Sequence, residues 1–349
     1  MEDYKKIVIM RTDRIGEVLL ATVAVDSIKK QYPGSEITFV TSDYSRDIID
    51  GRENVRELIT VDTFSKKGWL IKALRLACIL RKKRFDIAII LNPHKILHFA
   101  AFLSGIPLRI GYKRKWGFLL NKTILDTRSS GEKHETEYTM ELLKEIGVVP
   151  VFSEPRLPVF DSAERFIADI FLQNKINSKD LLVVVHPGSS NPIKMWGKDR
   201  YAELIKKIKL EINCTVVIIG SGKEFYLSED IVKTAEVKAF NFSGMFDLKQ
   251  LTAFLKNADV FIGNDTGSMH MAAALSVPVV AIFGRNIPGA GPVRWRPYGD
   301  KHAVIHKKTG CRDCSDQKCD YDRRCLRLVT VFDVYNAVKG IINPDKGCV

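Results

Sequence analysis

The segment GNDTGSMHMAAALSVPVVAIFG, residues 263–284, holds a strand end, a polar loop and a helix in a short space. The apolar run DVFI at 259–262 precedes it and is typical of a buried strand. The small residues at 268–275 favour a helix that packs closely on a sheet, and VPVVAIFG at 277–284 is typical of the next buried strand. The segment therefore predicts one strand–helix–strand unit of a parallel α/β sheet.

The same alternation runs through the rest of the second half. Strands are predicted at 181–186 and 215–220, and helices at 199–212 and 247–258. Four strands are followed by loops rich in Gly, Ser, Asn or Pro, with the sequences HPGSSNP, GSGKE, GNDTGS and FGRNIPGAGP. In open parallel sheets, ligands bind beyond the carboxyl ends of the strands, where helix N-termini favour anions. This half therefore predicts a nucleotide or phosphate site.

The first half shows a similar pattern. Strands are predicted at 6–10, 36–40 and 86–91, with an amphipathic helix at 18–31, which indicates a parallel sheet with crossover helices. The proline-bearing segment VVPVFSEPRLPVF at 148–160 then interrupts the alternation.

The length of 349 residues exceeds what one hydrophobic core usually spans, so we expect two domains. We place an N-terminal Rossmann-like domain at 1–155 and a second Rossmann-like domain at 156–329. The remaining tail, 330–349, starts with helical spacing, and the sequence leaves open which domain it packs on.

The composition is basic, with 54 lysine and arginine residues against 41 acidic ones and a net charge of +13. This balance favours an anionic partner, which could be nucleic acid, an acidic membrane surface or a phosphorylated small molecule. The most apolar window, 96–108, is interrupted by His98, Ser104 and Pro107, and the start of the chain has no signal-peptide pattern. We therefore expect a cytoplasmic protein.

Four of the seven cysteines lie in the short segment 311–325, with the spacing C-x2-C-x4-C-x5-C. In a reducing compartment such a cluster suggests a metal site, and four thiolates can hold a tetrahedral zinc ion. Metal binding, partial disulfide formation and simple packing all remain open for Cys311, Cys314, Cys319 and Cys325.

Two loops of the second half carry the candidate binding residues. Asp265, Thr266 and Gly267 are followed by His270 in the first turn of the predicted helix, where it could donate to a phosphate. Alternatively, these residues could form an aspartate N-cap beside a glycine turn, which would need no ligand. The second loop has Ser189, Ser190 and Lys194, and it favours a diphosphate ligand, although an isolated lysine is usually just solvated.

Two acidic residues complete the candidates. Glu224 follows a predicted strand, where it could accept from ribose hydroxyls or simply complement a helix dipole. Glu17, directly after Gly16, could be a first-turn helix acid or a base that takes a proton from an acceptor hydroxyl.

Four motifs together resemble the glycosyltransferase family of bacterial lipopolysaccharide heptosyltransferases. They are RIGEVLLATVAVDSIKKQYPG, HPGSSNPIKMWGKDRYAEL, GNDTGSMHMAAALSVPVVAIFG and the cysteine-bearing CRDCSDQKCDYDRRCL. They occur in the order of that family and span nearly the whole chain. The resemblance implies a GT-B architecture, in which two Rossmann-like domains face each other across a cleft. It also implies ADP-heptose on the second domain and the acceptor on the first.

The resemblance also implies roles for individual residues. The family's base is usually an aspartate after the first glycine, and Glu17 occupies that position here, while Gly197 replaces the proline of a lysine-x-tryptophan-proline motif. The donor would be held by Asp265, Thr266, Gly267 and His270 at its phosphates and heptose, Lys194 at the diphosphate and Glu224 at the adenosine ribose.

The function predicted is an inverting transfer of heptose from ADP-heptose to the lipopolysaccharide inner core. Such a transfer needs a base on one side of the sugar carbon and charge stabilisation for the leaving diphosphate on the other. Glu17 would supply the first, and Lys194, His270 and helix amides the second. No cofactor is required by this scheme, so zinc would be structural.

Basic residues of the first half suggest the partner surface. Lys66, Lys67, Lys72, Arg75 and the run 81–84 lie on or beside a predicted helix. Lys113, Arg114 and Lys115 precede a tryptophan and are the predicted acceptor-binding residues. A lipid-linked anionic acceptor at the inner membrane would use such a face, which predicts a cytoplasmic protein peripheral to that membrane. A solvated basic face is the simpler alternative.

The alternative function is a non-catalytic nucleic-acid-binding protein that uses the basic surface and a four-cysteine zinc module. That function does not explain four strand-end loops with phosphate-binding chemistry, and the sequence has no RNP, KH or helix-turn-helix signature. We therefore expect no nucleic acid partner.

Overall fold

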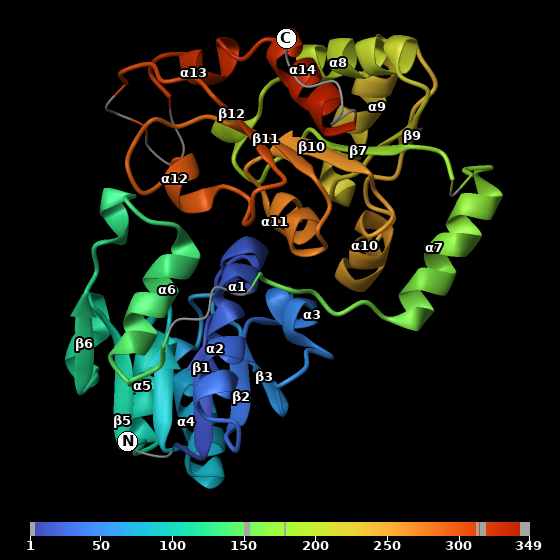
Figure 1. Ribbon diagram of the computed structural model, residues 1–349. Helices are drawn as coiled ribbons and strands as arrows, with labels where there is room; N and C mark the ends of the chain where they lie inside the picture. Colours follow the sequence, from blue (N-terminus) through green and yellow to red (C-terminus); the bar gives the residue numbers. More distant parts are fainter. Residues whose placement is uncertain (1–3, 150–153, 178, 312–313, 315–318, 343–349) are drawn as a thin grey trace. The chain divides into compact units, whose positions relative to one another are not determined.

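The computed structural model describes residues 4–149, 154–177, 179–311, 314 and 319–342. The chain divides into two compact units, residues 1–158 and 159–349 (Figure 1). The division falls after Pro158, inside the proline-bearing segment 148–160.

The first unit is built on a six-stranded parallel sheet in the order β3-β2-β1-β4-β5-β6. In chain order its strands are β1 (Lys6–Met10), β2 (Glu36–Thr41), β3 (Glu57–Thr60), β4 (Ile87–Ile90), β5 (Leu108–Lys113) and β6 (Lys122–Leu125). Ile7 of β1 pairs with Ile37 of β2 on one side and with Ile87 of β4 on the other. The strand order reverses between β1 and β4, and that reversal is where doubly wound sheets bind ligands.

The helices of the first unit are α1 (Ile15–Ala21), α2 (Val23–Gln31), α3 (Arg46–Ile49), α4 (Trp69–Lys83), α5 (Lys95–Leu103) and α6 (Glu135–Lys144). The single helix predicted at 18–31 in fact begins at Ile15 and is divided at Thr22. The Thr22 hydroxyl donates to the Leu19 carbonyl at 2.7 Å, a bond that competes with regular helix geometry.

The second unit repeats this plan with a parallel sheet in the order β12-β11-β10-β7-β8-β9. In chain order its strands are β7 (Leu182–His186), β8 (Thr215–Ile218), β9 (Phe240–Asn241), β10 (Val260–Asn264), β11 (Val279–Phe283) and β12 (Ala303–His306). The order again reverses once, here between β7 and β10. The predicted strands at 181–186, 215–220, 259–263 and 277–284 are confirmed with small changes of boundary.

The helices of the second unit confirm the predicted segments 199–212, 247–258, 268–275 and 330–342. The helices are α7 (Asp161–Gln173), α8 (Lys198–Glu211), α9 (Phe225–Ala235), α10 (Leu248–Leu255), α11 (Gly267–Ala274), α12 (Pro292–Trp295), α13 (Arg324–Arg327) and α14 (Val331–Ile342). The tail helix α14 packs on the second unit, because Val334 and Val338 are fully buried in the core that contains α8 and β10.

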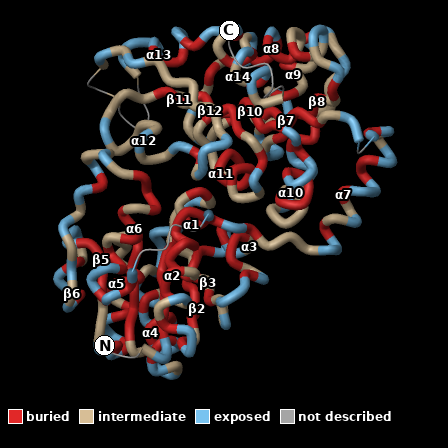
Figure 2. The backbone as a smooth tube through the Cα atoms, viewed as in Figure 1, coloured by how far each residue is buried: buried red, intermediate tan, exposed pale blue. Residues whose placement is uncertain are grey.

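Buried positions run along the central strands of each sheet (Figure 2). Ile7, Val8 and Ile9 of β1 and Val260, Phe261 and Ile262 of β10 have no exposed surface. Such strands are covered by helices on both faces and therefore appear as unbroken apolar runs in the sequence. Among the described helices, none has the length and apolarity needed to cross a bilayer.

Candidate functional site

Asn264, the last residue of β10, joins the loops at the strand reversal of the second unit. Its side chain is fully buried. The amide oxygen accepts from the Trp196 backbone at 3.2 Å and the Tyr201 hydroxyl at 3.1 Å, and the amide nitrogen donates to the carbonyls of Pro187 and Gly188. The sequence prediction missed Asn264, although a polar residue at the end of a wholly apolar strand is a usable signal.

Lys194 and Asp265 form an ion pair in which ammonium and carboxylate are 2.6 Å apart. Both side chains are mostly covered, with exposed fractions of 16% and 11%. Lys194 ends a short 3-10 turn, η4 (Pro192–Lys194), whose Asn191 side chain accepts from the Ile193 amide. The structure therefore brings together two candidate residues that are 71 positions apart in the chain.

Thr266 is the N-cap residue of α11, and its side chain makes no capping hydrogen bond to the helix. Its hydroxyl lies 3.0 Å from that of Ser268, which lies 2.6 Å from Nδ1 of His186. An aspartate N-cap therefore does not explain this motif. Gly267 is the first residue of α11, and His270, in the first turn as predicted, is buried with 5% of its surface exposed.

Glu224 lies against the loop that follows β7. Its carboxylate accepts from the Ser221 backbone at 2.7 Å and the Ser221 hydroxyl at 2.8 Å, and it lies 3.6 Å from Nε2 of His186. Burial alone would raise the pKa of Glu224, but His186 and the Ser221 donors hold it at about 2. A Cβ atom at Gly188 would lie 1.9 Å from the Glu224 carboxylate, so only glycine leaves room for this approach.

The two serines of the first loop have different environments. The Ser189 hydroxyl accepts from the Asn191 backbone at 3.2 Å and so stabilises the loop itself. Ser190 is exposed. His186, which the sequence prediction did not single out, lies between Ser268 and Glu224. It ends β7, and its position at a strand end was the signal that could have found it.

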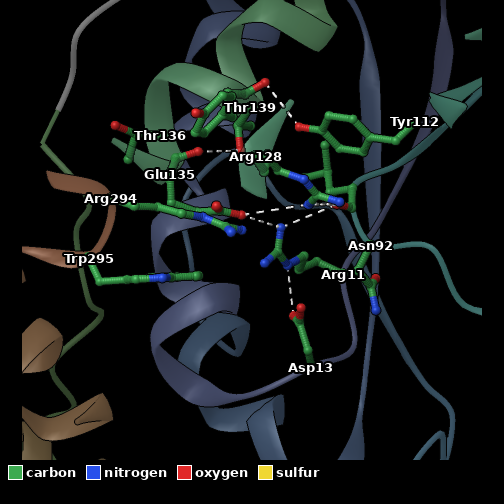
Figure 3. A network of polar contacts seen from close by, with 12 residues as sticks. Arg11, Asp13, Asn92, Tyr112, Arg128, Glu135, Thr136, Thr139, Arg294 and Trp295 are labelled. Carbon is green, nitrogen blue, oxygen red and sulfur yellow. Dashed lines mark hydrogen bonds and ion pairs between the residues drawn. The ribbon is translucent and has the colours of Figure 1, made fainter. Parts of the chain in front are cut away.

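A buried ionic network lies beyond β1 in the first unit (Figure 3). The Arg11 guanidinium donates to Asp13 at 2.7 Å and to Glu135 at 3.0 Å, and it also contacts the Leu91 carbonyl. Arg128 lies 3.9 Å from the same Glu135 carboxylate. The network joins the ends of β1 and β4 to the first residue of α6, and none of its members was predicted from the sequence.

Glu17 is the third residue of α1 and is partly buried. Burial raises its pKa, the nearby Asp13 carboxylate raises it further, and the charge of Arg11 lowers it. The net effect is a pKa above the usual range of a glutamate, which makes Glu17 a stronger base than a solvated carboxylate.

The predicted acceptor residues Lys113, Arg114 and Lys115 form an exposed corner between β5 and the 3-10 helix η2 (Lys115–Leu119). Arg114 lies 3.3 Å from Asp126, while Lys113 and Lys115 have no acidic partner among the described residues. Lys115 adopts a positive φ of 49° at the turn. The corner can therefore offer positive charge to an anionic ligand.

The structure does not confirm the zinc site that the sequence left open for the four clustered cysteines. All four are described and carry free thiols, so no disulfide joins them. Cys314 pairs with Cys319 in an isolated antiparallel bridge, and burial raises the pKa of the Cys325 thiol. No group of three or more His, Cys, Asp or Glu within the described ranges has an arrangement that could hold a metal ion. Of metal binding, disulfide formation and simple packing, the last fits Cys325, because its side chain is buried.

Comparison with known proteins adds an independent finding. The model of glycosyltransferase family 9 (heptosyltransferase) matches residues 73–324. A putative glycosyltransferase of Haemophilus influenzae is 27% identical over 322 residues, which cover 88% of this chain and 90% of the relative.

Solved structures agree in fold. The family 9 glycosyl transferase of Veillonella parvula has a TM-score of 0.86 at 22% identity, covering 98% of both chains. The ADP-heptose lipopolysaccharide heptosyltransferase II of E. coli has a TM-score of 0.80 at 22% identity, covering 98% of this chain and 100% of the other. The predicted fold class, α/β of the GT-B type with two Rossmann-like domains, is confirmed. Because the family model matches more than half of the chain, this protein belongs to glycosyltransferase family 9 (heptosyltransferase), and the enzyme class and family predicted from its motifs are correct.

Proposed function

We propose that this glycosyltransferase moves a heptose from ADP-heptose to the inner core of lipopolysaccharide, with inversion at the sugar carbon. The observation that carries the proposal is the Lys194–Asp265 pair beside the N-terminus of α11, at the strand reversal of the second unit. Lysine and helix amides at that position suit a diphosphate. Support for the sugar and the acceptor comes from the family and from the similar fold of the E. coli ADP-heptose lipopolysaccharide heptosyltransferase II.

The donor-binding part of the proposal assigns each residue a task. Lys194 exchanges Asp265 for the diphosphate, and the freed carboxylate accepts from the sugar hydroxyls. The amides at Thr266 and Gly267, together with His270, bind phosphate oxygens at the start of α11. Glu224 accepts from the adenosine ribose, and Ser189 and Ser190, on the loop that follows β7, contact the same donor.

The base in this proposal is Glu17. Its carboxylate takes the proton from the acceptor hydroxyl while that oxygen attacks the sugar carbon, and the bond to ADP breaks. Lys194 and the α11 amides stabilise the charge that develops on the leaving diphosphate. Because burial and Asp13 raise the pKa of Glu17, the carboxylate is a better proton acceptor near neutral pH than an ordinary glutamate.

The acceptor side of the proposal places the anionic core sugars on Lys113, Arg114 and Lys115. These residues are exposed and cationic, as an acidic or phosphorylated saccharide requires. The acceptor is lipid-linked in this proposal, so the enzyme acts in the cytoplasm at the surface of the inner membrane. The proposed transfer uses no metal ion, because Lys194 and the helix amides stabilise the charge of the leaving diphosphate.

The test is turnover of ADP-heptose with a panel of truncated lipopolysaccharide cores, measured as ADP release and as product mass. We expect one core length to be glycosylated and ADP-glucose to be a poorer donor. Turnover of another nucleotide sugar alone would overturn the donor assignment.

A parallel measurement compares the affinity for ADP with the affinity for an oligonucleotide at physiological salt. Tight oligonucleotide binding without ADP binding would support the nucleic-acid alternative instead.

A further inference from the structure

Helix α4 is apolar on two opposite faces. Ala73, Leu76, Ala77 and Leu80 are buried in the core of the first unit. On the outer side Leu70, Ile71, Leu74 and Ile79 keep 49%, 56%, 46% and 40% of their surface exposed. A surface helix normally carries charged and polar residues, not aliphatic ones, on the side that faces away from the core. A cluster of exposed aliphatic side chains on one helix therefore marks an interaction surface.

The charges around these side chains have one sign. Residues 63–85 include no aspartate or glutamate and eight cations, which are Lys66, Lys67, Lys72, Arg75, Arg81, Lys82, Lys83 and Arg84. Lys72 and Lys83 pair with Asp62 and Glu57. The other six cations are exposed and have no ion-pair partner within the part of the chain that the structure describes. We call Leu70, Ile71, Leu74 and Ile79 with Lys66, Lys67, Arg75, Arg81 and Lys82 the α4 face.

A chain of aromatic rings starts at the N-terminal end of the α4 face. Trp69, the first residue of α4, contacts Phe99 with ring centroids 5.3 Å apart, and Phe99 contacts Trp116 at 5.4 Å. Trp116 in turn lies 6.0 Å from Phe118, which is 73% exposed. Trp116 directly follows Lys115 of the cationic corner. Aromatic rings beside lysine side chains are characteristic of protein surfaces at the headgroup level of a bilayer.

We propose that the α4 face binds an anionic phospholipid bilayer, with its aliphatic side chains between the headgroups and its cations on the lipid phosphates. Charge complementarity favours a bilayer over other binding partners for this surface. A second copy of the chain would bring two wholly cationic surfaces together, which is repulsive. A nucleic acid would leave the aliphatic side chains in water without a partner, whereas a bilayer accommodates both groups.

The α4 face contains none of the residues assigned to the donor or to proton transfer. Lipid binding can therefore be measured without ADP-heptose or acceptor, and its failure would leave the proposed reaction untouched. If the reaction is also as proposed, the same face holds the enzyme where a lipid-linked acceptor is found. In that sense the inference deepens the proposed function, because it names the surface that meets the membrane.

The first experiment is co-sedimentation of the full chain with vesicles of phosphatidylcholine, with and without phosphatidylglycerol. Wild-type protein should bind the anionic vesicles and bind neutral vesicles much more weakly. Ile71→Glu with Leu74→Glu should weaken binding by roughly tenfold or more, because the change adds negative charge and removes the apolar contacts. The matched control is Leu172→Glu with Leu210→Glu, which makes the same change at two exposed leucines on α7 and α8. It should bind like the wild type.

The second experiment tests the cations of the α4 face separately from its aliphatic side chains. Each cation near an anionic surface is worth about fivefold in binding, so Arg75→Gln with Lys82→Gln should weaken it by roughly 25-fold, and added salt should reduce the difference. Lys175→Gln with Lys233→Gln is the control, since both lysines are exposed in the second unit. Circular dichroism and ADP affinity of every variant should match the wild type.

Three results would overturn the inference. One is equal vesicle binding by the α4 variants and their controls. Another is equal binding of the wild type to neutral and anionic vesicles. The third is a wild-type dimer in light scattering that Ile71→Glu with Leu74→Glu dissociates, with no vesicle binding, because the α4 face would then be a contact between copies of this chain.

Discussion

Glu17 combines a position at the start of α1 with a raised pKa, and this predicts the effect of removing its charge. Glu17→Gln should lower kcat by about two to four orders of magnitude, the usual contribution of a positioned base. Calorimetric ADP affinity should not change, because Glu17 belongs to the first unit. Glu17→Asp keeps the carboxylate and should retain much of the activity. Undiminished turnover in Glu17→Gln would assign proton transfer to another group.

The raised pKa of Glu17 also predicts a pH profile. The base must be deprotonated, so activity falls as the pH falls through its pKa. Because burial and Asp13 raise that pKa above the ordinary 4.5 of a glutamate, the acid limb of kcat/KM should lie above that value. Asp13→Asn removes one charge that raises the pKa, so it should move the limb to lower pH. A limb that does not move in Asp13→Asn would mean that the Asp13 charge does not act on the base.

Asn264 shows how one buried amide positions two loops. Asn264→Asp removes the two donors to Pro187 and Gly188 and places a carboxylate beside their carbonyls. We expect a loss of about 2 to 5 kcal/mol in the free energy of unfolding and about tenfold weaker ADP binding. Denaturant titration and calorimetry measure the two effects. Asn257→Asp is the control, because Asn257 is exposed and its side-chain amide donates to the Ala253 carbonyl of α10, away from these loops. Identical behaviour of both variants would contradict the positioning role.

At the scale of elements, the Asp126–Arg128 pair holds the short η3 (Arg128–Ser130) after β6. Arg128 donates to both oxygens of Asp126, at 2.8 and 2.9 Å, and Asp126 is only 6% exposed. Burial opposes ionisation, but these bonds lower the pKa of Asp126 from 3.8 to about 2. A lowered pKa stabilises the fold above the unfolded-state value of 3.8, and this stability is lost as the pH falls towards 2.

The expected contribution of this pair is about 2 kcal/mol at neutral pH. Asp126→Asn should remove it, so the difference in unfolding free energy between wild type and variant should shrink as the pH falls from about 4 towards 2, the range set by these pKa values. Denaturant titration at several pH values measures this, with the exposed Asp43→Asn as a control. A constant difference across the range would show that the pair does not act through ionisation.

The cationic corner between β5 and η2 predicts a selective kinetic effect. Replacing Lys113, Arg114 and Lys115 by glutamine should raise KM for the acceptor and weaken its salt dependence, with little change for the donor. Initial rates at two salt concentrations test this. Glutamine at Lys175, Lys179 and Lys233 removes the same charge elsewhere and serves as a control. An unchanged acceptor KM would mean that the corner is a solvated surface.

For the whole molecule, the proposed chemistry predicts that a chelator does not affect turnover. Lys194 and the start of α11 supply the charge stabilisation that a divalent ion would otherwise provide. Activity should therefore be the same before and after dialysis against EDTA, with added Mg²⁺ as a comparison. Loss of activity that Mg²⁺ restores would place a metal in the reaction. Metal analysis of the same samples, with thiol titration, reports independently on the four clustered cysteines.

Local sequence alone determined the central strands and about half of the helices, among them α8, α10, α11 and α14. β1, β7, β10 and β11 are buried on both faces, so each is a continuous run of apolar residues that can be read without knowing its neighbours. The strand-end loops with Lys194 and Asp265 were predictable for the same reason, because a parallel sheet gathers the carboxyl ends of its strands at one edge. β3, β5 and β6 were missed, since they lie towards the sheet edge, where polar side chains interrupt the pattern.

Only the tertiary structure decided which side chains meet. Arg11 and Glu135 are 124 residues apart in sequence, and Trp196 and Asn264 are 68 apart, yet each pair is joined by a buried hydrogen bond. No local pattern encodes these pairs, because they depend on the strand order β1-β4 and β7-β10 and on register. The same holds for the pKa values of Glu17 and Glu224, since burial and neighbouring charge exist only after the chain has folded. The folded structure also decides that the thiols of the cysteine segment are free.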